Sequence, residues 1–444
     1  MTGRMGLDRD FATISRRAML RGGVWLGAGV GLSALPFGSR LAWADSATEA
    51  QWPKVAALLD GYVSQRKLAG AVAALGWGTR PPGYIARGAL ALVGATPAGP
   101  DSLYRLYSQT KPVTGMAAMI LIDEGKLGLD QPLADLLPKF AKMQVQVTPD
   151  GSITELRPAK TPITIRNLLT HTAGLGYSII QKGPIKAAYE AAGLVPGQIS
   201  RLPIPGLGRG FAIKGLAAFA DKLAEMPLVY EPGSQWSYSV ALDLMGRVIE
   251  VASGQSFDGF LQERIFGPCG MTSTGFRVPA SEVGRLSTNY GVIGGTLVPL
   301  DPAASSIFLD DPAFPMGGAG LVGSPRDYDR FLTMLLGYGK IDGKRVMSEL
   351  AVRVGISNLL PEGAASEATM VSGAGFGAGG RVGLAGDMGT YGWGGAAGTV
   401  GFANFRYGLR GGFYTQYMPS DTYPLHTEFP KTVQLDLAAM RRAA

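Results

Sequence analysis

Cysteine and histidine are scarce in this sequence, which contains one cysteine, Cys269, and two histidines, His171 and His426, among 444 residues. A single cysteine cannot form an internal disulfide. Two isolated histidines do not supply the clustered ligands of a catalytic zinc site. No G-x-S-x-G elbow surrounds a serine that could pair with either of them. We expect His171 to be structural and His426 to lie on the surface. The sequence therefore predicts neither a metal site nor a Ser-His-Asp triad.

Charged residues are also few, at 17% of the chain against 46% hydrophobic residues, a balance typical of globular proteins. Much of the formal charge of +7 lies in the first 44 residues, which hold six Arg and two Asp. The rest of the chain carries 35 basic and 32 acidic side chains, a net charge of only +3. This small excess predicts no nucleic-acid partner and no binding to a membrane surface.

Long apolar runs are lacking after the N-terminal region, so we expect no stable membrane insertion. Residues 1–44 have the pattern of a twin-arginine export signal. The pair Arg16-Arg17 precedes an apolar run over residues 22–35, and Ala42-Trp43-Ala44 offers a small-x-small cleavage site. A membrane anchor is the alternative, but the apolar run is too short to span a bilayer. The sequence thus predicts a periplasmic or secreted protein.

The order of the predicted elements is strands, then helices, then strands again. Short apolar runs at residues 71–75, 84–86 and 89–93 alternate with Gly and Pro, which favours strands joined by turns. Helical periodicity follows, interrupted by a Gly- and Pro-rich stretch at 183–215 that we expect to be a loop. Strand patterns return after residue 372, and an amphipathic helix over 432–440 closes the chain. We expect one catalytic domain over residues 45–444. Its sheet lobe would comprise about 55–105 and 370–444, with a helical lobe of about 125–330 inserted.

Ser108 and Lys111 stand three residues apart at the start of an apolar helix that we expect to end near Gly125. Residues at i and i+3 share a helix face, so the Lys111 amine can reach the Ser108 hydroxyl. Unpaired N–H groups in the first turn favour developing negative charge. These are the needs of an activated serine nucleophile. A serine N-cap followed by a solvated lysine has the same spacing, so this motif alone decides nothing.

Two later segments add to the motif. Tyr238 lies in a turn just before a helix predicted from Ala241, where its phenol could face a cleft. Trp393, Gly394, Gly395 and Ala396 lie in a predicted strand, and the near-absence of side chains there lets a substrate approach the backbone. Three such elements in this order are far more specific than any one of them.

With these motifs, the chain resembles the serine β-lactamase and penicillin-binding-protein superfamily from about residue 55 to 420. It is most similar to class C β-lactamases and to the family VIII carboxylesterases that share their fold. The segments that carry the resemblance include Tyr107-Ser108-Gln109-Thr110-Lys111-Pro112, Leu168-Leu169-Thr170-His171-Thr172-Ala173-Gly174-Leu175, Tyr238-Ser239-Val240, Gly317-Gly318-Ala319-Gly320-Leu321 and Trp393-Gly394-Gly395. The resemblance implies an α/β (α+β) fold of the β-lactamase/transpeptidase type. Such a fold has a central antiparallel sheet flanked by helices and a largely helical lobe.

The resemblance also implies residue roles. Ser108 would be the nucleophile that forms the acyl-enzyme, Lys111 its proton-accepting neighbour, and Tyr238 the shared general base and later acid. The backbone N–H groups of Ser108 and Ala396 would form the oxyanion hole. Trp393, Gly394, Gly395 and Val240 would contact the substrate. No metal or organic cofactor is implied.

Two positions depart from the family pattern. Val240 replaces the usual asparagine of the Y-x-N element, and Trp393 replaces the lysine or histidine that begins the third motif. An indole in place of a cation makes the pocket more apolar, so we expect a carboxylesterase that cleaves small-molecule esters with small acyl groups. A β-lactamase or a D-alanyl-D-alanine-type carboxypeptidase or amidase is the alternative enzyme. A catalytically silent penicillin-binding-like module is the non-enzymatic alternative. The sequence leaves the oligomeric state open.

Overall fold

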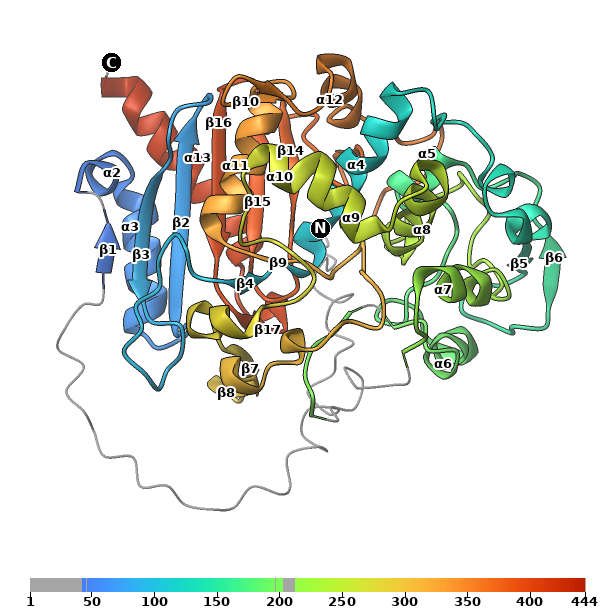
Figure 1. Cartoon of the computed structure of the whole chain (residues 1–444), viewed down its shortest axis with the longest axis horizontal. Coiled ribbons are helices and arrows are strands. Elements are labelled where there is room, and N and C mark those ends of the chain that lie inside the picture. Colours follow the sequence, from blue (N-terminus) through green and yellow to red (C-terminus); the bar gives the residue numbers. More distant parts are fainter. Residues whose placement is uncertain (1–41, 45, 196, 203–211, 444) are drawn as a thin grey trace, which may run out of the picture.

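A computed structural model describes residues 42–44, 46–195, 197–202 and 212–443. Its centre is an eight-stranded antiparallel sheet, built from both ends of the described chain (Figure 1). In spatial order the strands are β1 (Ala42–Ala44), β3 (Gly83–Gly88), β2 (Gly70–Trp77), β16 (Leu409–Tyr414), β15 (Val400–Asn404), β14 (Thr390–Gly394), β13 (Arg381–Val382) and β12 (Gly375–Phe376). The predicted antiparallel sheet with flanking helices is confirmed. Residues 1–41, which carry most of the predicted export signal, lie outside the described residues.

Helices cover both faces of this sheet. Helices α3 (Pro53–Ser64) and α13 (Leu425–Ala443) pack together on one face, while α11 (Pro325–Leu336) contacts β2, β15 and β16 from the other. Strand β2 shows why both faces are apolar. Its Ala71, Ala73 and Leu75 join the core under α3 and α13, and Val72 and Ala74 join the larger core on the opposite face. This alternation is the two-residue period of a strand buried on both sides.

The helical lobe lies to one side of the sheet in Figure 1. It contains α5 (Ile165–Leu169), α6 (Gly183–Ala191), α7 (Leu216–Leu223), α8 (Ala241–Ser253) and α9 (Phe257–Leu261). Helix α4 (Lys111–Asp123) connects the two lobes, because it contacts α8, α12 (Glu349–Gly355) and β14. Gly115 permits this close packing, since a Cβ atom there would lie 2.0 Å from the carbonyl oxygen of Ala378. The apolar α4 helix is therefore buried between sheet and lobe, as its sequence predicts.

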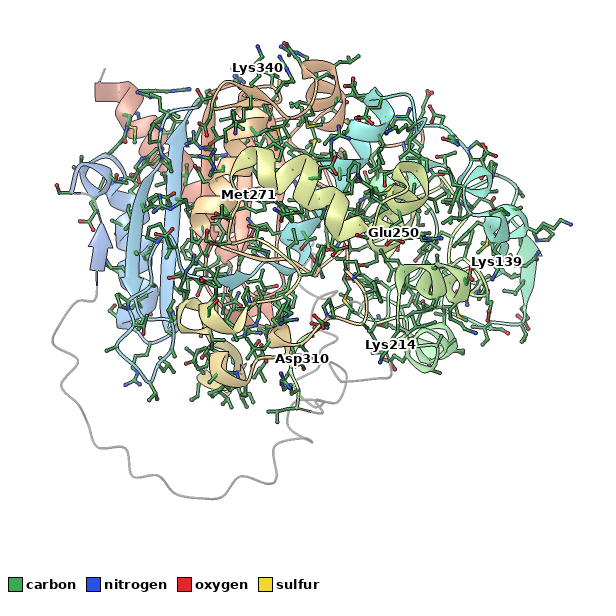
Figure 2. The ribbon with its side chains drawn as sticks, in the orientation of Figure 1. Lys139, Lys214, Glu250, Met271, Asp310 and Lys340 are labelled. Atoms are coloured by element: carbon green, nitrogen blue, oxygen red, sulfur yellow. The ribbon has the colours of Figure 1, made fainter. Side chains whose placement is uncertain are left out.

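Short elements complete the structure. A three-stranded sheet joins β17 (Tyr417–Met418), β7 (Asn289–Ile293) and β8 (Thr296–Asp301), and three two-stranded sheets pair β4 (Tyr104–Arg105) with β9 (Val322–Gly323), β5 (Gln144–Gln146) with β6 (Leu156–Pro158), and β10 (Lys340–Ile341) with β11 (Lys344–Arg345). Helices α2 (Ser46–Gln51) and α10 (Gly267–Cys269) are the remaining α-helices of the described residues. Charged side chains such as Lys139, Lys214 and Lys340 lie at the periphery (Figure 2). None of the helices in the described ranges has both the length and the hydropathy that a membrane crossing requires.

Three expectations about elements need correction. Residues 89–93 form no strand, only an isolated bridge from Ala89 to Pro97, and Val93 is 92% exposed. The stretch at 183–215 contains helix α6, whose Ile185 and Tyr189 are buried one turn apart. Its Pro184 lies in the first turn, where a helix tolerates proline. This proline, which suggested a loop, therefore marks the beginning of a helix. Helix α13 begins at Leu425, well before residue 432. It contains Pro430, a residue that usually ends a helix, so the sequence predicted the start too late.

Candidate active site

The turn that carries Ser108 is held under backbone strain. Tyr107 has a φ of 45°, in the left-handed region that non-glycine residues rarely adopt. Neighbouring segments fix the turn on both sides. The Leu106 N–H donates to the Leu321 carbonyl at 2.8 Å, and the Leu106 carbonyl accepts from Thr399 Oγ1 at 3.2 Å. A short 3₁₀ turn, Tyr107–Thr110, then leads into α4. The Ser108 side chain therefore sits at the helix start predicted from the sequence.

Lys111 is fully buried and directed at the serine. Its Nζ donates to Ser108 Oγ at 3.2 Å and to the carbonyl oxygen of Gly318 at 2.7 Å. A buried amine needs such partners, because an unpaired buried charge is costly. The solvated-lysine alternative is thus excluded by the burial of Lys111.

Gly318 also links Lys111 to a buried carboxyl group that sequence reasoning missed. The Gly318 N–H donates to Asp243 Oδ1 at 2.8 Å, and Asp243 is 1% exposed. Burial raises the pKa of the Asp243 carboxyl to about 6, although the nearby Lys111 charge opposes this rise. Asp243 lies in the first turn of α8, on the same helix that Tyr238 precedes. The two partners of Gly318 are far apart in sequence, so no spacing pattern could have predicted the link.

Tyr238 completes the group around the serine. Its phenol donates to Ser108 Oγ at 2.7 Å, and the Trp393 indole N–H donates to the same phenol oxygen at 3.2 Å. The Lys111 Nζ lies 4.5 Å from the centroid of the Tyr238 ring. Aromatic rings surround the phenol, with His171 at 4.9 Å and Trp236 stacked at 5.9 Å between ring centroids. Ser108, Lys111, Tyr238 and Trp393 therefore form one hydrogen-bonded group, contributed by three separate parts of the chain.

Two backbone N–H groups near Ser108 are available for a substrate oxygen. After β14 the chain turns tightly, with the Gly395 N–H donating to the Thr399 carbonyl at 2.8 Å. Within the described residues, neither the Ser108 N–H nor the Ala396 N–H has a hydrogen-bond acceptor. Both residues line the same cavity. An oxyanion hole needs two free donors directed at one substrate oxygen, and these two N–H groups are candidates for that role.

Among the described residues, neither histidine is hydrogen-bonded to Ser108. The His171 Nδ1 lies 3.1 Å from Ser239 Oγ. Burial lowers the pKa of His171 well below its usual value, and the nearby positive charge of Lys111 lowers it further. His171 is thus a neutral structural residue beside Tyr238, as expected. The expectation for His426 needs correction, because this residue is half-buried and its Nε2 lies 3.1 Å from the carbonyl oxygen of Gly395. Burial also lowers the pKa of His426.

A cavity of about 830 Å³ opens onto this group of residues. Its walls include Ser108 and Tyr238 together with Trp393, Gly394, Gly395 and Ala396. Val240, the remaining predicted substrate contact, lies elsewhere. It is fully buried at the N-terminus of α8, and it is not among the residues that line the cavity. Within the described ranges, no cluster of three or more His, Cys, Asp or Glu side chains could hold a metal ion.

Comparison with known proteins adds to this geometry. The chain is 39% identical to an uncharacterized protein of Mycobacterium tuberculosis over 254 residues. This matched segment covers 57% of this chain and 59% of that protein. The match thus spans less than two thirds of the relative's length. The chain is 32% identical over 293 residues to the esterase EstB of Burkholderia gladioli, covering 62% of this chain and 68% of EstB. The structure of EstCE1, a hydrolase with promiscuous acyltransferase activity, superposes with a TM-score of 0.68 at 26% identity, covering 86% of this chain and 98% of EstCE1.

The Beta-lactamase family matches residues 55–429, a range that includes Ser108, Lys111, Tyr238 and Trp393. The superposition agrees with the fold described above, an antiparallel sheet with flanking helices. The chain therefore belongs to the Beta-lactamase family, and it is similar to an esterase and to a hydrolase with acyltransferase activity.

Proposed function

We propose that this protein is a carboxylesterase that cleaves small-molecule esters through an acyl-enzyme on Ser108. The observation that carries the proposal is the convergence on one oxygen atom. Ser108 Oγ lies 2.7 Å from the Tyr238 phenol oxygen and 3.2 Å from Lys111 Nζ. A serine hydroxyl is a weak nucleophile until a neighbouring base takes its proton. Tyr238 and Lys111 are the two groups within hydrogen-bond reach that could form such a base system.

In the proposed reaction, the phenol proton of Tyr238 is first transferred to Lys111 through Ser108 Oγ, which lies within hydrogen-bond distance of both groups. Ser108 Oγ then attacks the ester carbonyl carbon while its own proton passes to the Tyr238 oxygen. The ammonium of Lys111 and the indole N–H of Trp393 stabilise that oxygen while it carries negative charge. The carbonyl oxygen, now an oxyanion, accepts hydrogen bonds from the Ser108 and Ala396 N–H groups. Where such donors have been removed in other enzymes, the loss is about 3–4 kcal/mol per donor.

Collapse of the tetrahedral intermediate breaks the bond to the alcohol oxygen, which takes the proton from Tyr238 and leaves as the free alcohol. A water molecule then attacks the acyl-enzyme and gives its proton to the Tyr238 oxygen. When the second intermediate collapses, Ser108 Oγ leaves and recovers that proton, and the carboxylic acid is released. Tyr238 thus accepts and returns one proton in each half-reaction, so no external cofactor is consumed.

The environment of Trp393 favours an ester over a β-lactam as the substrate. Its neutral indole lies where lysine or histidine begins the third motif in the β-lactamases that the sequence resembles, and its N–H is bonded to Tyr238. An ammonium at that position would attract a substrate carboxylate, whereas an indole supplies no charge. The similarity to EstB, named an esterase, supports the same choice.

The test is a rate comparison on three substrate classes at one pH. The purified protein is assayed with p-nitrophenyl butyrate, with the matching p-nitroanilide and with nitrocefin, and Ser108→Ala serves as the blank. We expect ester turnover that depends on Ser108 and exceeds nitrocefin turnover by at least about 100-fold. Faster hydrolysis of nitrocefin would instead identify a β-lactamase. Absence of turnover on all three, with intact folding, would indicate a silent module.

We also propose that residues 1–44 direct export by the twin-arginine route, on the basis of the Arg16-Arg17 pair and the apolar run that follows. Full-length protein expressed in a bacterium that has this pathway should appear in the periplasm or the medium, with a new N-terminus following Ala44. Replacing Arg16 and Arg17 by Lys together should retain it in the cytoplasm. Accumulation in the cytoplasm with an uncleaved N-terminus would contradict the proposal.

A further inference from the structure

The cavity at Ser108 continues far beyond the reacting atoms, along the C-terminal helix. Nine residues of α13 line it, and they recur in every turn of the helix: His426, Thr427, Pro430, Lys431, Val433, Gln434, Leu437, Ala438 and Arg441. The exposed members, from Thr427 to Arg441, are three or four positions apart and so share one face. At 1.5 Å per residue, this face is about 21 Å long. A small acyl group would fill only the first part of such a groove.

The two ends of the groove are fixed by contacts between α13 and the sheet. At the end near Ser108, His426 Nε2 lies 3.1 Å from the Gly395 carbonyl oxygen, next to the Ala396 N–H. Gly394 permits this approach, because a Cβ atom there would lie 3.1 Å from His426 Nε2. At the far end, the Arg441 guanidinium lies 4.1 Å from the centroid of the Tyr407 ring. The groove therefore runs from the predicted oxyanion hole to the last turns of α13.

The floor of the groove is apolar and its rim is polar. Val400 and Phe402 from β15 and Val433 and Leu437 from α13 line it, and all four are less than 9% exposed. At the rim, Lys431 and Gln434 are exposed. An apolar channel with a polar rim suits an aliphatic chain, because each methylene removed from water strengthens binding by up to about fourfold.

We propose that this groove binds the acyl chain of the substrate, and that the preferred substrates are esters of medium- to long-chain aliphatic acids. The inference rests on the proposed esterase function and changes the expected acyl group from small to long. Successive residues of β14 face opposite sides of the strand, and this indicates which half of the ester enters the groove. Trp393 faces Tyr238, and the next residue, Gly394, faces His426 on the opposite side of the strand. The leaving alcohol must lie toward Tyr238, its proton donor. The acyl chain is the remaining substituent and is directed toward α13.

The test uses p-nitrophenyl esters of increasing acyl length, from acetate to hexadecanoate, below their aggregation limits. For the native protein we expect kcat/KM to rise at least tenfold from butyrate to dodecanoate. Gln434→Trp and Ala438→Trp each place a large ring over the groove. Ala438 lies one helical turn farther from His426, about 6 Å. Gln434→Trp should therefore shift the optimal chain length to a shorter acid than Ala438→Trp does.

The matched control is Ala439→Trp, the same substitution at the neighbouring exposed position, which does not line the groove. It should leave the chain-length profile unchanged. A profile that falls beyond butyrate, or an equal effect of Ala438→Trp and Ala439→Trp, would overturn the inference while leaving the esterase function intact. A length preference seen only when the alcohol is lengthened would also overturn it.

A binding measurement keeps the inference testable if no ester is hydrolysed, which would count against the proposed function alone. Dodecanoate and butyrate are titrated into the Ser108→Ala variant by calorimetry. We expect dodecanoate to bind at least tenfold more tightly, and Gln434→Trp to abolish that difference in the same background. Equal affinities for the two acids would show that the groove does not hold an acyl chain.

Discussion

The indole N–H of Trp393 donates to the phenol oxygen of Tyr238 at 3.2 Å, and the same oxygen lies 2.7 Å from Ser108 Oγ. Trp393 therefore contacts the proposed base as well as lining the cavity. A neutral donor at this position can stabilise the Tyr238 oxygen when it is negatively charged, without offering a charge to the substrate. This gives the tryptophan a role beyond making the pocket apolar.

The role of the Trp393 N–H is tested by Trp393→Phe, which keeps an aromatic ring and removes the donor. Hydrogen bonds to charged groups contribute about 1.5–3 kcal/mol, so we expect kcat/KM on p-nitrophenyl butyrate to fall by about 10- to 100-fold. The control is Trp236→Phe. Trp236 stacks on Tyr238, but among the described residues its Nε1 has no hydrogen-bond partner. Both variants should lose some thermal stability, whereas only Trp393→Phe should lose most activity. Equal activity losses would show that ring packing, not the donor, is what matters.

Tyr238→Phe removes a single oxygen atom, so packing should change little while proton transfer is lost. General acid–base groups contribute about 10²–10⁴-fold, and we expect kcat to fall within that range. Thermal unfolding of the variant reports whether the aromatic cluster is intact. Full activity in a folded Tyr238→Phe protein would show that Lys111 acts as the base without the phenol.

Asp243 predicts a pH dependence of stability. Burial raises its pKa from an ordinary value of 3.8 to about 6 in the folded protein. Between these two pH values the folded state holds a proton that the unfolded state has released, so the contribution of Asp243 to stability falls as pH rises through this window. Asp243→Asn removes the titration and keeps an oxygen for the Gly318 N–H. The variant should gain roughly 2–3 kcal/mol over the native protein between pH 4 and pH 6.5.

This difference is measured by urea unfolding of both proteins across that pH range. A constant difference between them would mean that Asp243 is already ionised in the folded protein at pH 4. A difference that shrinks as pH rises would mean that Lys111 lowers the pKa of Asp243 more than burial raises it.

Local sequence patterns predicted the elements that depend on local spacing. The apolar run after Lys111 predicted helix α4. The strand patterns at both ends of the chain predicted every strand of the main sheet except β1, whose Ala42–Ala44 were assigned to the export signal. The resemblance brought Ser108, Lys111, Tyr238 and Trp393 together, although they are up to 285 positions apart in the sequence. Their actual distances and hydrogen bonds required the structure.

Contacts that depend on long-range packing had no signal in the sequence. The Gly318 carbonyl that accepts from Lys111 is 207 residues away, and a carbonyl group is present at every position. His426 seemed a surface residue because Pro430 concealed the helix that places it against Gly395. Val240 occupies a motif position, yet the chain turns it into the protein interior rather than toward the cavity. A motif thus indicated the proposed reacting residues but not the surroundings that position them.

The central claim is that Ser108 forms a covalent acyl-enzyme, and intact-protein mass spectrometry after treatment with a fluorophosphonate tests it most directly. The native protein should gain the mass of one phosphonyl group, and peptide mapping should place it on Ser108. Ser108→Ala should gain no mass, and Tyr238→Phe should be labelled at least 100-fold more slowly if Tyr238 removes the serine proton. Labelling of another residue, or equal labelling of Ser108→Ala, would contradict the assignment of Ser108 as the nucleophile.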